Sequence, residues 1–331
     1  MDPLTRIHQL AQKLKKRIVF PEYHDSRILQ AVVRLAETGG IQPILVCPAN
    51  DVPNSIRSDS QITILDPQDS IFQKQFPFIF YELRKHKGMS FYEARKIIND
   101  PLIFGGLLLA TGRADGMIAG ATNSTANVLR AAVWTVRTRP GTTIISGSFL
   151  IVTPDHDFGD DGCMFFADCA VNPDPTARQL VDITRETAAT AQALLGMNPR
   201  IAMLSFSTKG SARHPMVEKV RQATELVMGN LPGATIDGEL QLDAALVPEV
   251  ASAKAPNSKL GGNANILIFP DLNSGNIGYK LAQRLGRAKA IGPIIQGLAR
   301  PVNDLSRGCT VQDIVDLAAI TSCQAREPGD V

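Results

Sequence analysis

The sequence predicts an α/β protein whose sheets are mostly parallel. Short apolar runs alternate along the chain with loops rich in Gly, Pro, Asn and Ser and with stretches in which apolar residues recur at helical spacing. This alternation is typical of parallel strands covered by helices. The length of 331 residues exceeds that of an ordinary single domain, so we expect two domains. The runs expected to be strands are Arg17–Phe20, Pro43–Val46, Gly116–Ala119, Ile201–Ser205 and Asn265–Phe269.

The first β-α-β unit shows how the elements are assigned. After the strand Arg17–Phe20, Asp25 is suited to cap a helix, and the pair Gly39-Gly40 is suited to end it. The next strand, Pro43–Val46, then completes the unit. The buried face of the helix is expected to hold Ile28, Leu29, Val32, Val33 and Ala36.

The composition changes near residues 151–175, where Pro, Asp and Gly are crowded together. Because these residues favour turns, we interpret the stretch as a hairpin or loop soon after the chain enters a second domain. No internal repeat and no low-complexity tract interrupts the pattern. The last two expected strands therefore belong to that second domain.

The charge balance limits the kind of ligand to expect. Thirty-four Lys and Arg stand against 32 Asp and Glu, a formal net charge of +2, which is too small for a dedicated nucleic-acid binder. A few placed cations must therefore meet any anionic ligand. The five cysteines are odd in number and lack CxxC spacing, so neither a disulfide framework nor a metal site is expected. Reduced thiols fit the cytoplasm.

Two features argue against export and membrane insertion. The N-terminal segment carries Lys13, Lys15, Lys16 and Arg17 where a signal peptide needs an apolar stretch, and no cleavage site follows. The most apolar segment, Leu102–Ala110, is far shorter than the roughly 20 residues of a membrane span. We therefore expect a soluble cytoplasmic protein that has no membrane partner.

Ligands of open α/β sheets bind beyond the carboxyl ends of the strands, and the loop after the third expected strand carries suitable groups. Thr122, Ser124 and Thr125 offer hydroxyls near the start of a helix, where free backbone N–H groups suit an oxyanion such as phosphate. Arg130, nearly two turns into that helix, is a further candidate ligand. The alternative is ordinary capping by Asn123 or Ser124 with a surface arginine. The loop matches neither the Walker nor the G-x-G-x-x-G pattern.

A second loop, Ser306-Arg307-Gly308, combines a hydroxyl, a guanidinium and a permissive glycine just before an expected helix. Beside a helix N-terminus, such groups form a compact anion site. Asp313 follows Thr310 by three residues, so the pair also fits a capping box, and the alternative is that Asp313 only caps the helix. Cys309 has no histidine near it in the sequence and is interpreted as a packing residue.

Three further segments are candidates on weaker grounds. Lys209 and Arg213, after the fourth expected strand, either bind a ligand or only face solvent. Lys280 lies on the segment after the fifth strand and is expected to face a cleft together with two asparagines. Arg84 begins a run of four potentially cationic side chains, which either binds the peripheral phosphates of a nucleotide-like ligand or forms a solvated turn. Together these loops indicate a phosphate-handling α/β enzyme without naming its reaction.

In their order along the chain, these motifs resemble the phosphate acetyl/butyryltransferase family, and most of all its acetyl-transferring members, the phosphate acetyltransferases. The resemblance extends over nearly the whole chain, and the ordered set is specific although no single motif is. It rests on Ile18–Glu22, Leu83–Gly88, Ala121–Arg130, Phe206–Pro215, Asp237–Ala245, Lys254–Ser258, Phe269–Lys280 and Asp304–Cys309.

The resemblance implies more about the fold than the residue pattern does. Members of the family have two α/β domains with a cleft between them, in an architecture like that of isocitrate and isopropylmalate dehydrogenases, and are usually homodimers. Their C-terminal segment returns to the first domain. We therefore expect residues 1–148 and 294–331 to form one domain and residues 149–293 to form the other.

The resemblance also implies a reaction, in which acetyl-CoA and phosphate reversibly give acetyl phosphate and coenzyme A. Coenzyme A is then a substrate, and neither a bound cofactor nor a metal is expected. By the match of motifs, Arg84 holds a phosphate of CoA, and Arg130 and Arg307 hold phosphate or polarise the acyl carbonyl. Ser306 orients the thiol or stabilises the oxyanion, and Asp313 takes the thiol proton.

Three alternatives remain open. Butyryl transfer, within the same family, differs in the size of the acyl pocket. A non-catalytic acetyl-CoA sensor, like the related domain of some malic enzymes, has no need of the intact set Ser306, Arg307 and Asp313. A decarboxylating dehydrogenase of the isocitrate type needs clustered metal-binding aspartates, which the polar loops lack. Asp313 itself needs a buried setting to act as a base, because a carboxylate is a far weaker base than a thiolate.

Overall fold

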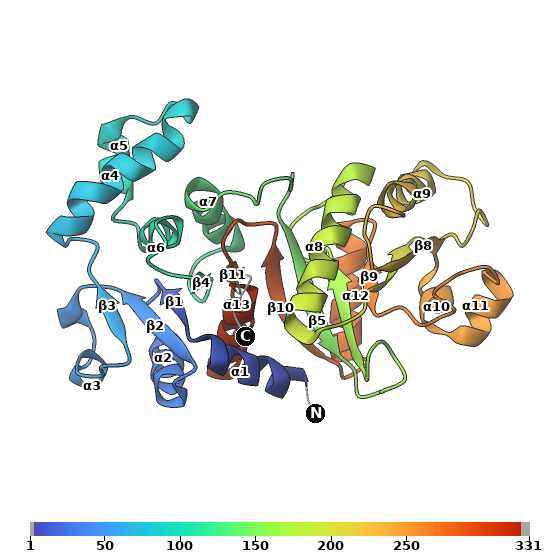
Figure 1. Ribbon diagram of the computed structural model, residues 1–331, viewed down its shortest axis with the longest axis horizontal. Helices are drawn as coiled ribbons and strands as arrows, with labels where there is room; N and C mark the ends of the chain where they lie inside the picture. The colour runs from blue at the N-terminus through green and yellow to red at the C-terminus, as the bar shows by residue number, and fades with distance from the viewer. Residues whose placement is uncertain (1–2, 326–331) are drawn as a thin grey trace. The chain divides into compact units, whose positions relative to one another are not determined.

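The computed structural model describes residues 3–325 of the chain. Its contacts divide the protein into two compact units, Met1–Pro140 with Leu298–Val331 and Gly141–Gly297. The boundaries expected from the sequence, after residues 148 and 293, lie 8 and 4 residues from these. The first unit thus combines an N-terminal and a C-terminal segment of the sequence (Figure 1).

The first unit contains a five-stranded sheet with the order β11-β4-β1-β2-β3, in which all neighbouring strands are parallel. The predicted strands in this part of the chain are confirmed as β1, β2 and β4. The strands are β1 (Lys16–Phe20), β2 (Ile41–Val46), β3 (Thr63–Leu65), β4 (Gly116–Ala119) and β11 (Val302–Asp304). The helices are α1 (Pro3–Leu14), α2 (Ser26–Thr38), α3 (Asn54–Arg57), α4 (Ser70–Arg84), α5 (Phe91–Ile97), α6 (Pro101–Ala110), α7 (Thr125–Thr135) and α13 (Val311–Gln324), with two 3-10 turns, η1 (Ala49–Asp51) and η2 (Lys85–Lys87).

Helices cover both faces of this sheet. Figure 1 shows α6 and α7 on one face and α1 and α2 on the other, where α13 packs against both α1 and α2 and against β1 and β4. Most side chains of α13 are buried as a result. Helix α2 begins after its N-cap Asp25 and ends at Gly39, which adopts the left-handed conformation, as the sequence predicts.

The second unit contains a six-stranded sheet with the order β10-β5-β6-β9-β7-β8. Strands β6, β9, β7 and β8 are parallel neighbours, whereas β5 pairs antiparallel with both β10 and β6. The strands are β5 (Ser146–Val152), β6 (Cys163–Ala167), β7 (Arg200–Leu204), β8 (Thr235–Leu240), β9 (Ile266–Ile268) and β10 (Lys289–Gln296). The helices are α8 (Ala177–Leu195), α9 (Pro215–Val227), α10 (Leu242–Leu246), α11 (Pro248–Lys254) and α12 (Leu272–Arg284).

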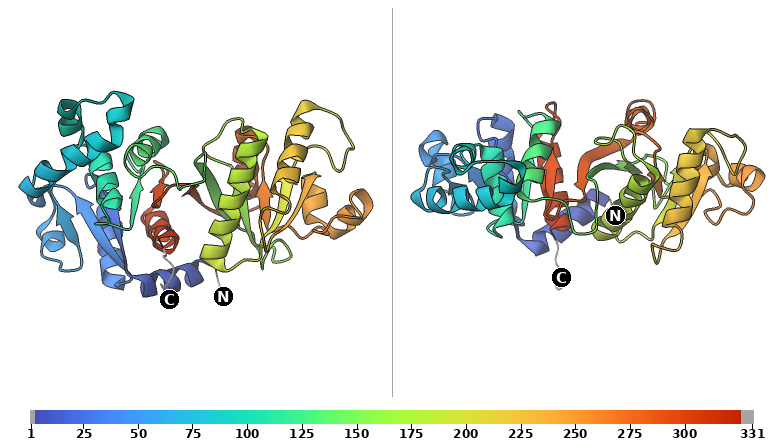
Figure 2. Two further views of the ribbon diagram at one scale, coloured as in Figure 1. Left: turned by 45° about the horizontal axis from the view of Figure 1, so that its top comes forward. Right: turned by 90° about the horizontal axis from the view of Figure 1, so that it is seen from above.

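The layers of the second unit follow the same principle. Helices α8 and α9 lie side by side on one face of the sheet (Figure 2). The other face packs against α10 and α12, with a core that includes Phe149, Phe166 and Phe269. The antiparallel pair β5–β6 confirms the hairpin expected around residues 151–175, and the two predicted strands are β7 and β9. Both sheets are mostly parallel, so the predicted α/β class is confirmed.

Three observations bear on the expectations from composition. Within residues 3–325, every helix is too short or too polar to span a lipid bilayer. All five cysteines are buried, and none of them forms a disulfide bond. The described residues contain no group of three or more His, Cys, Asp or Glu side chains that could hold a metal ion.

Candidate functional site

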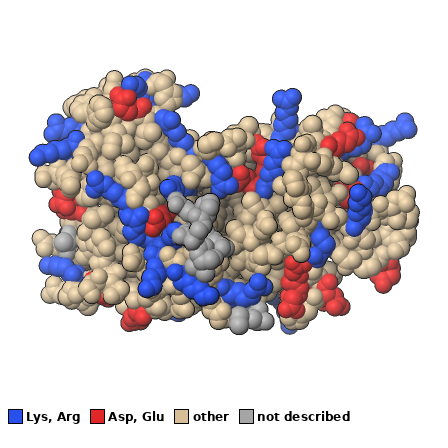
Figure 3. Space-filling view, in the orientation of Figure 1, with Lys and Arg blue, Asp and Glu red and all other residues tan. Residues whose placement is uncertain are grey.

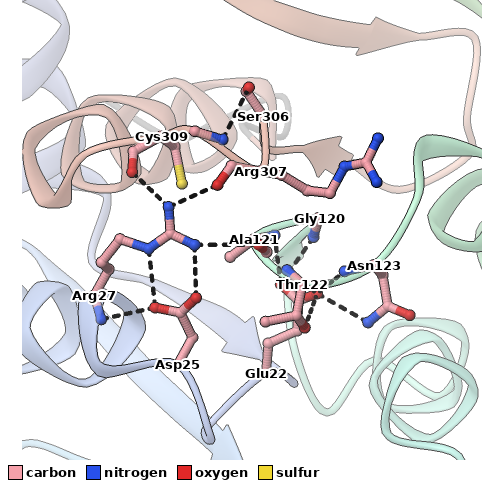
Figure 4. A network of polar contacts seen from close by, with 11 residues as sticks. Glu22, Asp25, Arg27, Gly120, Ala121, Thr122, Asn123, Ser306, Arg307 and Cys309 are labelled. Carbon is pink, nitrogen blue, oxygen red and sulfur yellow. Dashed lines mark hydrogen bonds and ion pairs between the residues drawn. The ribbon is translucent and has the colours of Figure 1, made fainter.

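The loop between β4 and α7 is wrapped around the carboxylate of Glu22, which lies just beyond the end of β1 and is 5% exposed. Its Oε2 accepts the N–H groups of Gly120 and Ala121, each at 2.8 Å. Its Oε1 accepts those of Thr122 and Asn123, at 3.1 and 2.9 Å. The Thr122 hydroxyl and the Asn123 side-chain amide also donate to Oε1, both at 2.9 Å. Six donors therefore converge on one side chain (Figure 4).

This arrangement changes the role expected of the loop. The sequence predicts that free N–H groups here bind phosphate, but Glu22 already accepts four of them. The Thr122 hydroxyl is engaged with Glu22, and the Ser124 hydroxyl accepts the N–H of Asn127 and so caps α7. The Thr125 hydroxyl donates to a neighbouring carboxylate. The loop is thus an internally satisfied support, because a buried carboxylate has taken the place expected for an anionic ligand.

Asp304, the last residue of β11, is a second buried carboxyl at this edge of the sheet and is 2% exposed. Its Oδ2 accepts the Thr125 hydroxyl, while its Oδ1 is buried without a partner among the described residues. Burial raises the pKa of Asp304 to about 6; the Thr125 hydrogen bond lowers it and the charge of Glu22 raises it by smaller amounts. Burial also acts to raise the pKa of Glu22, but hydrogen bonds from Asn123 and Thr122 outweigh it and keep that pKa below its ordinary value.

The ends of β4 and β11 meet at Gly120. The Leu305 N–H donates to the Ala119 carbonyl at 2.7 Å, which continues the pairing of the two strands. A Cβ atom on Gly120 would lie 2.4 Å from Asp304 Oδ1, and the φ of Gly120 is +114°. Only glycine therefore lets the two strand-end loops approach this closely.

Arg27, in the first turn of α2, connects three loops through its guanidinium (Figure 4). Its Nε and Nη2 form an ion pair with Asp25, at 3.0 and 2.6 Å. Its Nη1 donates to the carbonyls of Arg307 and Cys309, at 2.9 and 2.7 Å. Its Nη2 also donates to the carbonyl of Ala121, at 3.1 Å. The five N–H groups of the guanidinium therefore match five acceptor contacts.

The loop after β11 presents Ser306 and Arg307 to solvent. The Cys309 N–H donates to the Ser306 carbonyl at 2.9 Å and the Gly308 N–H donates to Ser306 Oγ at 3.2 Å, so the backbone forms a tight turn. Figure 4 shows the guanidinium of Arg307 pointing away from Arg27. Cys309 is buried, and burial raises the pKa of its thiol. These features agree with a packing role for the thiol and leave the hydroxyl and the guanidinium for a ligand.

Asp313 is part of the capping box that the sequence predicts. Its Oδ2 accepts the N–H and the hydroxyl of Thr310, at 2.8 and 2.9 Å, and Thr310 Oγ1 accepts the Asp313 N–H at 3.2 Å. The Asp313 side chain is exposed in its own unit. The unit therefore does not supply the buried setting that a strong base requires.

Arg84 and Arg130 lie against the same indole ring. The Cζ atoms of Arg84, the last residue of α4, and of Arg130, in α7, are 5.0 and 5.7 Å from the centroid of the Trp134 ring. Arg130 Nη2 donates to Asn127 Oδ1 at 2.9 Å. Arg84 Nε is buried and has no hydrogen-bond partner in the described part of the chain. The structure thus brings together two cations that the sequence placed 46 residues apart.

The candidates of the second unit make contacts within that unit. Lys209 pairs with Asp237. Lys280, on α12, is exposed and donates to Asn276 Oδ1 at 2.7 Å. His214 caps α9, and its Nδ1 accepts the N–H of Met216 at 3.2 Å.

Four residues of the first unit were not singled out from the sequence: Glu22, Arg27, Trp134 and Asp304. Glu22 lies just after the end of a predicted strand, as the predicted ligand-binding loops do. Its position in the sequence could therefore have identified it as a candidate. Trp134 is the only tryptophan of the chain and follows Arg130 by four residues, a spacing that places both on one helix face. The long-range contacts of Arg27 leave no such local signal.

The distribution of charge fits a ligand met by single placed cations. On the face drawn in Figure 3, Lys and Arg occur in separate groups interspersed with Asp, Glu and uncharged residues. The exposed guanidinium of Arg307 and the two arginines at Trp134 are candidate sites for an anion.

Known proteins resemble this chain over almost its entire length. The family profile described as phosphate acetyl/butaryl transferase matches residues 3–322. The chain belongs to this family. It is 49% identical over 328 residues to a phosphate acetyltransferase from Thermoanaerobacterium thermosaccharolyticum, a match that covers 98% of this chain and 100% of the relative.

Solved structures agree with this membership. A phosphotransacetylase from Streptococcus pyogenes has a TM-score of 0.92 and 45% identity, covering 98% of this chain and 99% of that one. A protein described as a 4-hydroxythreonine-4-phosphate dehydrogenase from Salmonella typhimurium has a TM-score of 0.52 and 12% identity, covering 94% and 99%. The second likeness concerns the fold alone and agrees with the dehydrogenase-like architecture. Because the chain belongs to the phosphate acetyl/butyryltransferase family, it is an acyltransferase.

Proposed function

We propose that the protein is a phosphate acetyltransferase, which transfers acetyl reversibly between coenzyme A and inorganic phosphate. The observation that carries the proposal is the turn at Ser306 and Arg307, which exposes a hydroxyl and a guanidinium on a backbone held by Arg27. Two further cations, Arg84 and Arg130, meet on one indole ring in the same unit. The relatives' names, at 45% and 49% identity, favour acetyl over butyryl as the transferred group.

The proposed reaction forms one bond and breaks one. The sulfur of CoA thiolate attacks the carbonyl carbon of acetyl phosphate and gives a tetrahedral oxyanion. Collapse of this intermediate forms the thioester and breaks the bond between carbon and the phosphate oxygen. The proton lost by the thiol passes by way of Asp313 to the departing phosphate. Negative charge develops on the carbonyl oxygen and on the phosphate, and both are suited to arginine.

Three residues are proposed to meet these charges. Arg307 and Arg130 grip the phosphate group or polarise the acyl carbonyl, and Ser306 donates its hydroxyl to the oxyanion or orients the thiol. Support comes from the exposure of all three side chains and from the internal hydrogen bonds that fix the turn at Ser306. A fixed backbone keeps such donors from reorganising during the reaction.

Asp313 is proposed to receive the thiol proton. Its carboxylate is exposed and already accepts two hydrogen bonds from Thr310, and a carboxylate is a far weaker base than a thiolate. Arginine charge beside the bound thiol favours the ionised thiol. Asp313 therefore acts as a late proton acceptor and not as a strong base.

Arg84 is proposed to hold a phosphate of CoA, with Arg130 beside it. Support comes from their shared indole ring and from the buried Arg84 Nε that lacks a partner in the described part of the chain. Thr122, Ser124 and Thr125 are proposed to shape the binding site through their loop, because their hydroxyls already make contacts within the protein.

The resemblance to the family supports further proposals about substrate, ligands, assembly and location. Coenzyme A is a substrate, and the protein works without a bound cofactor. Lys280 is a further phosphate ligand. The protein is a homodimer of the cytoplasm, and sedimentation of the purified chain measures the first part of that statement.

Release of CoA thiol from acetyl-CoA tests the proposed function. We expect release to require phosphate and to produce acetyl phosphate in equal amount, and butyryl-CoA to turn over more slowly. Faster turnover of butyryl-CoA would identify a butyryltransferase. Tight binding of acetyl-CoA without thiol release would identify a sensor, and NAD-dependent turnover would identify a dehydrogenase.

A further inference from the structure

Three loops at one edge of the first sheet are connected by a side chain that has no part in the proposed chemistry. The loop after β1 contributes Asp25, the loop after β4 contributes the carbonyl of Ala121, and residues 305–309, the Ser306 loop, contribute two carbonyls. All of these acceptors bind the guanidinium of Arg27 (Figure 4). One side chain thus fixes the Ser306 loop to its two neighbours.

We propose that Arg27 is a positioning residue for acyl transfer, which fixes the Ser306 loop so that the Ser306 hydroxyl and the Arg307 guanidinium meet the acyl phosphate together. The inference rests on the proposed function. Arg27 acts through the loop and not on the substrate, because protein acceptors use all five of its N–H groups. This distinguishes it from Arg307, whose guanidinium is exposed and points away from Arg27.

The geometry requires the forked shape of arginine. Nη1 holds the carbonyls of Arg307 and Cys309, two residues apart, while hydrogen bonds from the Gly308 and Cys309 N–H groups close the same turn onto Ser306. The turn is therefore held from outside and from inside. A lysine has three donors on a single atom and does not reach acceptors in three directions.

Asp25 keeps the guanidinium of Arg27 in place. Its Oδ1 accepts both Nε and the backbone N–H of Arg27, and its Oδ2 accepts Nη2. These hydrogen bonds, above all those from the side chain, lower the pKa of Asp25, so the pair stays ionised at neutral pH. The Asp25 side chain is also the N-cap of α2, which anchors the pair to the start of a helix.

Two substitutions test the proposal. We expect Arg27→Ala and Arg27→Lys to lower kcat about 100-fold, because a displacement of about 1 Å at the reacting groups has that effect. The KM for CoA should change by less than about threefold. Arg84 and Arg130 are unchanged in these variants, so the contacts proposed to bind CoA remain. Arg34→Ala is the matched control. Arg34 lies on the same helix and donates to Gln312 Oε1 at 2.8 Å, so its loss removes a contact between α2 and α13 without affecting the Ser306 loop, and kcat should stay near that of the wild type.

A second readout does not depend on activity. Cys309 is buried within the Ser306 loop, so its rate of labelling by DTNB in the folded protein reports release of the loop. We expect one additional fast-reacting thiol in Arg27→Ala but not in Arg34→Ala, and its disappearance when Cys309→Ser is added. Methylguanidinium in solution should occupy the vacated position in Arg27→Ala, slow the labelling and restore kcat at least tenfold.

The outcomes separate the proposal from the function on which it rests. A wild-type protein that releases no thiol from acetyl-CoA contradicts the proposed function, while the labelling still reports on the loop. An active wild type together with Arg27 variants that keep kcat, or that change only KM, overturns the positioning role. If Arg27→Ala does not fold, Arg27→Lys, which keeps a positive charge beside Asp25, decides the same question.

Discussion

In the second unit, Asp168 follows the end of β6 just as Glu22 follows the end of β1 in the first. Both side chains are buried, at 2% and 5% exposure, and each carboxylate accepts several N–H groups. The donors to Asp168 are the backbone N–H groups of Gly147, Ala170, Val171 and Asn172 and the side-chain amide of Asn172. Two units of one chain have thus placed a carboxylate in a similar setting.

The two carboxylates differ in what they connect. Most donors to Asp168 lie two to four residues further along the chain, so Asp168 shapes its own loop. The donors to Glu22 lie 98 to 101 residues away, so Glu22 fixes one strand end to the next. Burial raises the pKa of Asp168 despite its hydrogen bonds, whereas hydrogen bonds keep the pKa of Glu22 below its ordinary value. Together with Arg27, Glu22 therefore fixes three strand-end loops of the first unit to one another.

The largest effect is expected at Arg307. Arg307→Ala should lower kcat for phosphate-dependent cleavage of acetyl-CoA about 1,000-fold, because it removes positive charge where negative charge develops. Arg213→Ala, an exposed arginine of a strand-end loop in the second unit, is the matched control and should keep its kcat. Equal losses in the two variants would break the contrast between the units, and near-normal turnover of Arg307→Ala would remove Arg307 from the site.

Glu22→Gln should affect both stability and turnover. The NH2 group of the new amide is a donor that faces the N–H groups of residues 120–123, so the free energy of unfolding should fall by about 3 kcal/mol. Because the loop is then less well fixed, kcat should fall about 30-fold. Because folding lowers the pKa of Glu22, its stabilisation exists above the ordinary carboxyl pKa and is lost as pH falls, so the variant should approach the wild type below about pH 4. Urea unfolding across pH measures this.

Asp168→Asn is the companion to that variant. It should alter the free energy of unfolding while kcat keeps its wild-type value, because Asp168 shapes a loop of the second unit. A large loss of kcat in Asp168→Asn, at unchanged stability, would show that the loop around Asp168 in the second unit is also needed for the reaction.

Asp304→Asn should stabilise the protein at alkaline pH. Folding raises the pKa of Asp304 from 3.8 to about 6, so its stabilisation is fully present below the unfolded pKa and is lost as pH rises through 6. An asparagine keeps the oxygen that accepts the Thr125 hydroxyl and carries no charge. We expect the variant to exceed the wild type by about 2 kcal/mol at pH 8 and to match it near pH 4. A gain of the same size at both pH values would contradict the burial of an ionisable Asp304.

The smallest effect is expected on CoA binding. Arg84→Ala should raise the KM for CoA about tenfold, or about 1.4 kcal/mol, and Trp134→Phe, which keeps an aromatic ring beneath both arginines, by about twofold. Trp134 is the only tryptophan, so CoA binding should also change the intrinsic fluorescence of the wild type. If Lys280→Ala raises KM as much as Arg84→Ala does, Lys280 contributes as much to CoA binding as Arg84 does.

Much of the fold could be predicted because buried parallel strands are short apolar runs between turn residues. The strands β3, β8, β10 and β11 escaped prediction. Of these, β8 and β11 carry buried polar residues, among them Glu239 and Asn303. Each of these has a hydrogen-bond partner that the local sequence pattern does not predict. Glu239 accepts the Ser207 hydroxyl, and the Asn303 side-chain amide donates to the Thr321 hydroxyl. Polar residues in a strand are thus explained only by tertiary contacts.

The exposed groups of the candidate site could be predicted from the sequence, whereas the contacts that hold its loops in place could not. Ser306 and Arg307 stand in a recognisable motif beside a helix start. The free N–H groups expected after β4 were misjudged, because the sequence does not reveal that β4 lies next to β1, and only that adjacency brings Glu22 to the loop. Arg27 shows the same limit, since its acceptors lie as many as 282 residues away.

The discontinuous first unit has a consequence for the order in which the protein is made. A ribosome synthesises residues 141–297, the whole second unit, before β11 and α13. Until then β4 is an edge strand, and α1 and α2 lack the helix that packs against both. Domains generally fold as units during synthesis, so the second unit can be complete on a nascent chain whose first unit is still open. The carbonyls that Arg27 binds in the Ser306 loop emerge late, so these contacts form only after the whole second unit has been synthesised.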